Sequence, residues 1–330
     1  MKRVLAVLMA CLMTLSFQVY ASDASTESNS TDVSGKRIFF INVWRALDFF
    51  VNIEAAVKKE AEEYGVEVTC VDANLDYVAT SDYMSQAVIG QYDCIMIDGD
   101  ESLVPAANEA EAQGVPVINY DTYIGGKTSA LVASDNKDMG RLDGEYAVEL
   151  LKEKYDGEVK GVIYYLNFPV SSMQDRCAGF LEVFEEYPDV TLIEEVPNAE
   201  DVEVCQKLMD NVLIAAPEGN IDMIFASNSS SALGTIAAVE SAARKDVIVI
   251  GIDDEEGQLN ELKKADSCYY ATVAQDPIAI GKYCVEAAVK VMNGEEVEDI
   301  AVPAKLLTKE NIEEYIAENE SAKAELDAYK

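Results

Sequence analysis

Side chains able to bind a small molecule recur just after apolar runs of this sequence. Asp121 follows the run at 115–119, and Asp253 follows the run at 247–252. The complete set of candidates is Trp44, Arg45, Phe49, Phe50, Asp121, Arg176, Asn228, Asp253 and Gln275. Carboxylates accept hydrogen bonds, arginines donate them and amides do both, which suits the hydroxyls of a polyol. Aromatic rings can cover the C–H faces of a sugar and exclude water from them.

Each candidate also has a purely structural interpretation. A lone Asp after a strand often serves as a helix cap or a loop residue. Phe49 and Phe50, at the start of a predicted helix, could belong to a core. The recurrence of such residues at several strand ends favours a shared binding role over these separate ones.

The elements that must position these residues are short apolar runs alternating with amphipathic stretches from Lys36 onward. The stretch at 49–64, for example, has apolar residues at helical spacing and ends at Gly65. The same alternation restarts near Asp138, which predicts an α/β protein with two doubly wound lobes, each a parallel sheet covered by helices. Ligands bind beyond the carboxyl ends of such strands, so candidates from both lobes should meet in one cleft.

Composition excludes several classes of function. The 330 residues carry 61 Asp and Glu against 25 Lys and Arg, a formal net charge of −36. A surface this acidic repels nucleic acid and anionic lipid but does not exclude a neutral ligand. The sequence contains no His, which excludes a Ser-His-Asp triad and a His-based metal site. No metal site and no cofactor are predicted.

The N-terminal segment is typical of an export signal. Lys2 and Arg3 precede an apolar run, and small residues allow cleavage after Ala21. A polar stretch at 22–35 follows, with the composition of a flexible linker. These features predict a protein exported to the periplasm or the cell surface. The segment around Cys11 also resembles a lipoprotein cleavage box, which leaves lipidation as an alternative.

The chain has seven Cys residues and no CxxC pair, so neither a zinc knuckle nor a thioredoxin-like motif is indicated. Export permits disulfides. Cys70 and Cys94, however, lie in apolar runs where Cys commonly acts as a small hydrophobic residue. We expect mostly free thiols.

Seven segments in order resemble the type I periplasmic sugar-binding proteins of the ribose/galactose-binding group. Asp121 and Asp253 match that family's two ligand-binding Asp residues, and Arg176 matches its ligand-binding Arg. No single motif is specific, but their order from Ile38 to Leu307 is. The segments lie at 48–51, 114–121, 132–136, 176–180, 224–228, 249–253 and 271–277.

The resemblance implies two lobes joined by three chain crossings, near the hinge residues Ser134, Gln275 and Val302. The expected divisions are a signal peptide at 1–21, a linker at 22–35, an N-terminal lobe at 36–134 plus 276–302, a C-terminal lobe at 135–275 plus 303–309, and an acidic tail at 310–330. We expect the tail to be helical and peripheral.

The resemblance also implies a function. The protein would be an extracytoplasmic solute-binding protein that closes around a sugar or sugar-like molecule and delivers it to the permease of an ABC transporter. An alternative is a sensor that presents a sugar or furanone signal to a chemoreceptor or sensor kinase. The family implies a monomer that is not an enzyme.

The chain departs from the ribose-binding pattern at three positions. Leu47 stands where the pattern has Asn, Thr122 where it has Arg, and Glu200 or a neighbour where it has an aromatic residue. Trp44 and Arg45 could replace some of these groups. The departures predict a neutral polyol-type ligand other than ribose.

Two other classes fit the sequence less well. A transcription regulator with the same two-lobed fold needs a basic helix-turn-helix before the first lobe, where this chain has the signal-like segment and an acidic linker. A nucleotide-binding enzyme needs a glycine-rich phosphate loop after the first strand, and residues 42–50 contain no Gly. Catalysis by paired carboxylates is not excluded, but nothing in the sequence favours it.

Overall fold

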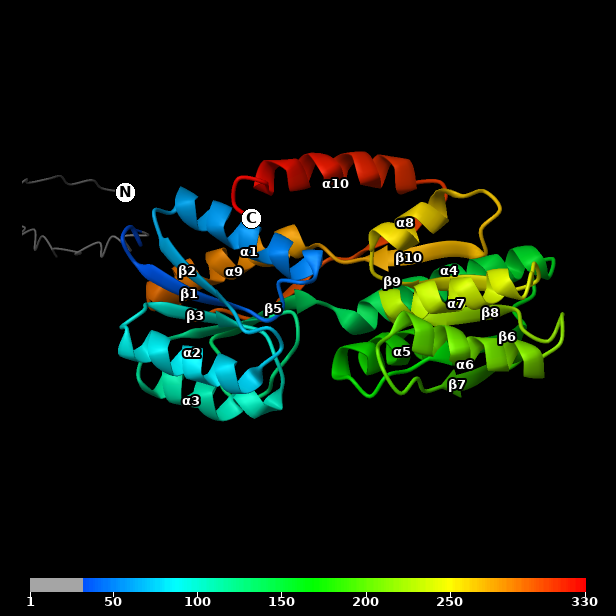
Figure 1. Ribbon diagram of the computed structural model, residues 1–330, viewed down its shortest axis with the longest axis horizontal. Coiled ribbons are helices and arrows are strands. Elements are labelled where there is room, and N and C mark those ends of the chain that lie inside the picture. The colour runs from blue at the N-terminus through cyan, green and yellow to red at the C-terminus, as the bar shows by residue number, and fades with distance from the viewer. Residues whose placement is uncertain (1–31) are drawn as a thin grey trace, which may run out of the picture. The chain divides into compact units, whose positions relative to one another are not determined.

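A computed structural model describes residues 32–330, so the predicted signal peptide, Cys11 and most of the predicted linker lie outside it (Figure 1). The first lobe is built on a six-stranded sheet of the order β11-β5-β4-β3-β1-β2, in which all neighbours are parallel. Its strands are β1 (Arg37–Asn42), β2 (Glu67–Asp72), β3 (Cys94–Ile97), β4 (Val117–Tyr120), β5 (Ala130–Ser134) and β11 (Ile300–Val302).

The second lobe repeats this plan with a sheet of the order β12-β10-β9-β8-β6-β7. Only the β10–β12 pair is antiparallel. The strands are β6 (Gly161–Leu166), β7 (Val190–Glu195), β8 (Met223–Ala226), β9 (Ile248–Ile252), β10 (Tyr269–Ala274) and β12 (Lys305–Thr308). The predicted fold class, two parallel-sheet α/β lobes, is confirmed.

Helices cover both faces of each sheet, and residue alternation along the strands explains why. In β1, Ile38 and Phe40 pack in one core and Phe39 and Ile41 in another, because successive side chains point to opposite faces. In the first lobe, α1 (Asp48–Glu63) and α9 (Pro277–Met292) cover one face, and α2 (Tyr77–Ile89) and α3 (Val104–Ala112) cover the other.

In the second lobe, α4 (Asn136–Lys154) and α5 (Ser171–Val183) pack on one face of the sheet. The other face is covered by α6 (Val202–Ala215), α7 (Ser229–Ser241) and α8 (Glu256–Lys263). Short 3₁₀ turns precede α3, at Glu101–Leu103, and follow α5, at Phe184–Glu186. These layers place the carboxyl ends of both sets of strands toward the crossings between the lobes.

The chain passes between the two lobes at three places. It runs from β5 to α4 past Ser134, from β10 to α9 past Gln275, and from β11 to β12 past Val302. The three residues predicted as hinge positions therefore stand at the crossings. Rotation about them stays a prediction.

The tail forms a helix, α10 (Ile312–Leu326), as expected. The helix lies on the outside of the molecule, as expected of a peripheral tail, but its first and last residues are both buried. Ile312 is 2% exposed and packs in a core of the second lobe, and Leu326 is 1% exposed and packs against Ala55 and Ala56 of α1. The acidic composition of the tail predicts an exposed helix. It does not indicate that the apolar residues at the two ends are buried.

The six cysteines that the structure describes are all free, which confirms the expectation for them. Cys70, Cys94 and Cys284 lie in the first lobe, and Cys177, Cys205 and Cys268 lie in the second. Burial raises the pKa of the Cys70 thiol to about 12 and that of Cys205 to about 11. Thiols of this kind are weak nucleophiles because the thiolate is the reactive form.

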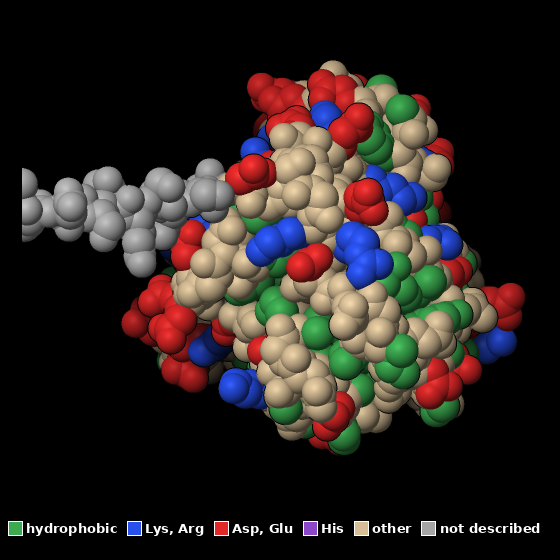
Figure 2. Space-filling model, turned by 90° about the vertical axis from the view of Figure 1, so that its left-hand side faces the viewer, with side chains coloured by type: hydrophobic (Ala, Val, Ile, Leu, Met, Phe, Trp, Pro, Cys, Tyr) green, Lys and Arg blue, Asp and Glu red, His purple; other side chains and the backbone are tan. Residues whose placement is uncertain are grey.

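The surface carries the charge imbalance of the sequence. Figure 2 shows one end of the first lobe, where acidic side chains are spread around the margin and Lys and Arg side chains lie between them. Within residues 32–330, no helix is both long enough and apolar enough to cross a membrane.

Candidate ligand-binding site

Arg176 is the centre of the second lobe's side of the site. It lies on α5, is 6% exposed, and is held by hydrogen bonds from its guanidinium. Its Nε donates to Asn136 Oδ1 at 2.9 Å, and its Nη1 donates to the carbonyl of Ser227 at 3.0 Å. Asp253 Oδ1 lies 3.6 Å from the same Nη1. The fork is thus fixed by three partners before any ligand arrives.

Asp253 follows β9 and connects Arg176 to Gln275. Its backbone has a φ of 81°, in the left-handed region that costs a non-Gly residue free energy and is found at functional sites. Its Oδ2 accepts from the backbone N–H of Ser229 at 3.0 Å, and its Oδ1 accepts from Gln275 Nε2 at 3.1 Å. Gln275 Oε1 is buried without a hydrogen-bond partner among the described residues. A buried acceptor left in this state suits a ligand that donates.

Asn228 has the capping role that the sequence left open, and its binding role stays a prediction. It is the N-cap of α7, where its Oδ1 accepts from the backbone N–H of Ser231 at 3.0 Å. The Asn is 6% exposed and lies beside Ser227, whose carbonyl binds Arg176. The cap uses the side-chain oxygen and leaves the amide nitrogen to donate.

Asp121 faces these groups from the first lobe. It follows β4 with a φ of 59°, again in the left-handed region. Burial raises the pKa of its carboxyl to about 6; the positive charge of Arg176 opposes this rise, and the negative charge of Asp253 adds to it. Asp121 therefore lies within electrostatic range of two groups on the other lobe. Among residues 32–330, Asp121 forms no hydrogen bond or ion pair with Arg176 or Asp253.

Asp98 is a further candidate site residue, which the sequence reasoning missed. It directly follows β3, and its Oδ1 accepts from the backbone N–H of Thr122 at 3.1 Å. It is 4% exposed, and burial together with the charge of Asp121 raises the pKa of its carboxyl well above the usual value. The rule that located Asp121, a polar residue just beyond a parallel strand, could have located Asp98 as well.

Phe49 and Phe50 meet edge to face, with ring centroids 5.1 Å apart. Both are half-buried at the start of α1 and pack in part against the first lobe's core, so the core interpretation describes part of each ring and the binding interpretation stays a prediction. Trp44 is also half-buried, in the loop before α1.

Arg45 is held away from the other candidates. Its Nε and Nη2 donate to the two carboxylate oxygens of Glu54 at 2.8 Å and 2.9 Å. Glu54 is 5% exposed, and its carboxylate also accepts a hydrogen bond from Asn42 and forms an ion pair with Lys58. Burial favours the neutral form of Glu54, but these donors outweigh it and lower the pKa of the carboxyl. The structure thus brings Arg45 into a network of the first lobe and not into the set around Arg176.

Glu200, one of the departures from the family pattern, lies near the site before α6. Burial raises the pKa of its carboxyl, with Arg176 opposing the rise and Asp253 adding to it. Across the lobes, Tyr77 on α2 has its pKa raised by burial and by charges that include Asp98 and Glu200. Glu200 therefore places an acceptor near Arg176 and Asp253.

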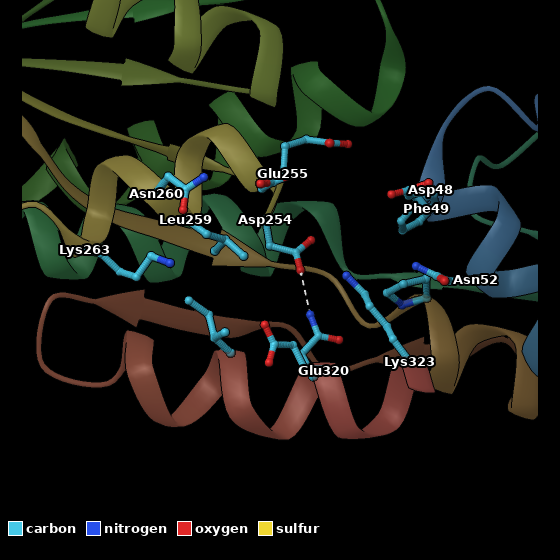
Figure 3. A pocket seen from close by; sticks show the side chains of 14 residues that line it. Asp48, Phe49, Asn52, Asp254, Glu255, Leu259, Asn260, Lys263, Glu320 and Lys323 are labelled. Atoms are coloured by element: carbon cyan, nitrogen blue, oxygen red, sulfur yellow. Dashed lines mark hydrogen bonds between the residues drawn. The ribbon is translucent and has the colours of Figure 1, made fainter. Parts of the chain in front are cut away.

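A hollow of about 410 Å³ adjoins Phe49 between the lobes and α10. Figure 3 shows Lys323 of α10 extending between Asp254 of the second lobe and Asp48, Phe49 and Asn52 of α1. Acidic groups from both lobes thus face one another across this space.

Chemically, the site offers hydrogen-bond donors and acceptors. Arg176 donates, the carboxyl groups of Asp98, Asp121 and Asp253 accept, and Gln275 keeps an unpartnered acceptor. In the part of the chain that the structure describes, no group of three or more Cys, Asp or Glu side chains could hold a metal ion. The arrangement suits recognition of a molecule rich in hydroxyls.

The chain is similar in sequence and in structure to known solute-binding proteins. The ribose import binding protein of Bacillus subtilis (strain 168) is 32% identical over 268 residues, which are 79% of this chain and 83% of that protein. A solved ABC transporter solute-binding protein from Bacillus halodurans C-125 with bound myo-inositol superimposes with a TM-score of 0.75 at 29% identity, covering 86% of this chain and 98% of that one.

A solute-binding protein from Mycobacterium smegmatis with bound glycerol superimposes with a TM-score of 0.73 at 27% identity, covering 85% and 96% of the two chains. Residues 38–296 match the model of the periplasmic binding protein domain family. The resemblance read from the sequence is therefore confirmed. The chain belongs to the periplasmic binding protein family and is one of its extracytoplasmic solute-binding proteins.

Proposed function

We propose that this protein captures a neutral sugar or polyol between its lobes and delivers it to the permease of an ABC transporter. The observation that carries this proposal is the prebuilt network of Arg176, Asp253 and Gln275 opposite Asp121. Fixed donors and acceptors of this kind contribute to affinity because little side-chain freedom is lost on binding. The relatives named above bind ribose, myo-inositol or glycerol, which are all polyhydroxyl compounds.

We propose a ligand other than ribose. Thr122 is a short hydroxyl side chain whose backbone N–H is used by Asp98, so it offers no cationic fork. Glu200 places an acceptor near Arg176 and Asp253. A ring with more hydroxyls, such as a hexose or a cyclitol, would use that additional acceptor.

We further propose that capture works by rotation of the lobes 36–134 plus 276–302 and 135–275 plus 303–309 about Ser134, Gln275 and Val302. Asp121 and Arg176 form no direct bond in this structure, and a ligand held between the lobes would join them on closure. Ligand contacts with both lobes favour the closed arrangement by their difference in affinity for the two states.

A thermal-shift screen tests the ligand assignment. The mature protein is heated with D-ribose, myo-inositol, D-glucose, D-galactose and glycerol, with leucine as a non-polyol control. A ligand that binds only the folded state raises the melting temperature by mass action. The Arg176→Ala variant should lose that rise. If no sugar or polyol raises the melting temperature above the leucine control, the proposed ligand class is wrong.

Export belongs to the proposal as well. The family is extracytoplasmic, and the segment 1–21 has the charge and apolar pattern of a signal peptide. Mass spectrometry of the protein from expressing cells should show cleavage after Ala21. A mass that corresponds to a diacylated N-terminal Cys11 would replace this with lipidation.

A further inference from the structure

The C-terminal helix α10 connects the two lobes without being one of the three crossings. It begins at Ile312, just after β12 of the second lobe, and ends at Leu326 against α1 of the first lobe (Figure 1). At a rise of about 1.5 Å per residue, its 15 residues span roughly 22 Å. The family match ends at residue 296, before this helix.

Its attachment to the second lobe is apolar and buried. Ile312 packs within that lobe's core, and Tyr315 and Ile316 pack against the same core. The Tyr315 hydroxyl donates to Asp254 Oδ2 at 2.6 Å, and Asn319 Nδ2 lies 3.4 Å from the same oxygen. Asp254 is the residue after Asp253, so the root of the helix is fixed directly behind a ligand-site carboxylate.

Its attachment to the first lobe is smaller and more polar. Leu326 is buried between Ala55 and Ala56, and Tyr329 packs beside it. Lys59 pairs with Glu325 at 2.7 Å, and the Tyr329 hydroxyl donates to Glu62. Exposed ion pairs of this kind contribute little, so Leu326 and Tyr329 carry most of this attachment.

Between these attachments α10 carries the polar links from one lobe to the other. Within residues 32–330 and outside the crossing segments, the polar links between the lobes run through the tail. Residues 325–329 of the tail form the hydrogen bonds and the ion pair with the first lobe. The ligand-site residues contribute none, because Asp121 and Arg176 form no direct bond. The attachments of α10 therefore hold the lobes in an arrangement in which no direct bond joins the two sides of the site.

We propose that α10 is a strap that stabilises the open, ligand-free arrangement and must release its first-lobe attachment for the lobes to close. A rigid helix keeps the distance between its two ends fixed. Rotation of the lobes changes the distance between α1 and α8, which both line the hollow of about 410 Å³ beside α10. Any contact made only in the open arrangement favours that arrangement and weakens the apparent affinity for a ligand that needs the closed one.

The test measures the distance between the lobes without a ligand, so its outcome is independent of the proposed ligand class. Spin labels are attached through Val78→Cys on α2 and Ile214→Cys on α6, two side chains that are 75% and 81% exposed. The native thiols are buried or half-buried, so labelling favours the introduced sites. Pulsed electron spin resonance then gives the distribution of distances.

In the full-length chain, Leu326→Ala with Tyr329→Ala removes the first-lobe attachment. We expect the distribution to broaden toward distances that the unmodified protein does not populate. The control Glu313→Ala with Glu314→Ala changes two exposed residues of the same helix and should leave the distribution unchanged.

If the double variant does not fold, Glu325→Lys places a like charge beside Lys59 at the surface and should broaden the distribution in the same direction by less. Circular dichroism identifies the folded variants. A distribution identical to that of the unmodified protein in a folded attachment variant would overturn the proposal.

Discussion

The two sides of the binding site are built by different means. On the second lobe, Arg176, Asp253 and Gln275 form a connected network of opposite charges and amides. On the first lobe, Asp98 is buried and Asp121 is half-buried, and desolvation raises the pKa of both carboxyl groups. One side is already paired, whereas the other holds acceptors that lack a cationic partner within bonding distance.

This difference suggests an order of events. The second lobe can present a fixed surface to an arriving ligand at little cost in side-chain freedom. The first lobe gains most binding free energy when the ligand's hydroxyls and Arg176 approach Asp121. Burial deprives the Asp121 carboxylate of hydrogen bonds from water, and these groups would replace them. The second lobe would then bind first and the first lobe would complete the site on closure.

Replacing Arg176 should have the largest effect if the second lobe carries the affinity. Hydrogen bonds to a charged group contribute about 1.5–3 kcal/mol each. Loss of two of them through Arg176→Ala would weaken binding roughly 100-fold or more. Isothermal titration with the ligand from the screen measures this. Arg176→Lys keeps the charge without the planar fork, so its affinity for the ligand should lie between that of the unmodified protein and that of Arg176→Ala. Unchanged affinity in the Ala variant would remove Arg176 from the site.

Lowering the pH should weaken binding through the first lobe. The pKa of Asp121 is about 6 in the free protein, so its carboxyl is largely protonated at pH 5 and ionised at pH 7. Hydroxyls that donate to the carboxylate favour the ionised form, so binding releases a proton and the Kd should rise about tenfold from pH 7 to pH 5. Asp121→Asn should bind more weakly at pH 7 and show a flatter profile. A pH dependence that persists in this variant would assign it to another group.

The aromatic pair should contribute a smaller part of the first lobe's share. Phe49→Leu removes a ring while keeping an apolar side chain at the core boundary. We expect a loss of about 0.5–1.5 kcal/mol, or roughly two- to tenfold in Kd. The same titration on Phe50→Leu shows which ring covers the ligand. If Phe49→Leu and Phe50→Leu both bind the ligand as tightly as the unmodified protein, the two rings belong to the core alone.

Arg45 should matter least to binding, which would separate it from the first lobe's ligand groups. Arg45→Ala leaves Glu54 with Asn42 and Lys58. Because the Arg45 side chain is 39% exposed, its loss should lower the free energy of unfolding by less than about 1 kcal/mol. Urea denaturation measures this change, and titration should give an unchanged Kd. A clear loss of affinity would return Arg45 to the binding site.

Much of this arrangement could be predicted from the sequence because the fold follows from local patterns. Apolar runs alternating with amphipathic stretches specify parallel strands and covering helices, and Asp121 and Asp253 follow from the ends of those strands. The first residue of α2 is harder to predict, because Asp76 caps the helix at Tyr77 and other acidic residues lie nearby. A cap is a short-range signal that several acidic residues could have provided.

Features that depend on contacts distant in sequence could not be predicted in this way. The pairing of Arg45 with Glu54 gives Arg45 a structural role in the first lobe, and no local sequence pattern distinguishes that role from ligand binding. The position of Leu326 against Ala55 depends on the path of the chain after β12. Such contacts join segments whose separation the local pattern does not encode.

The free thiols make each lobe report its own unfolding. Three described cysteines lie in each lobe, and burial raises the pKa of thiols in both, as with Cys94 in the first and Cys177 in the second. An alkylating reagent added to the folded protein should therefore react slowly, and each modified peptide identifies the lobe that opened. The native cysteines of the two lobes therefore allow mass spectrometry to determine which lobe opens first, without any engineered label.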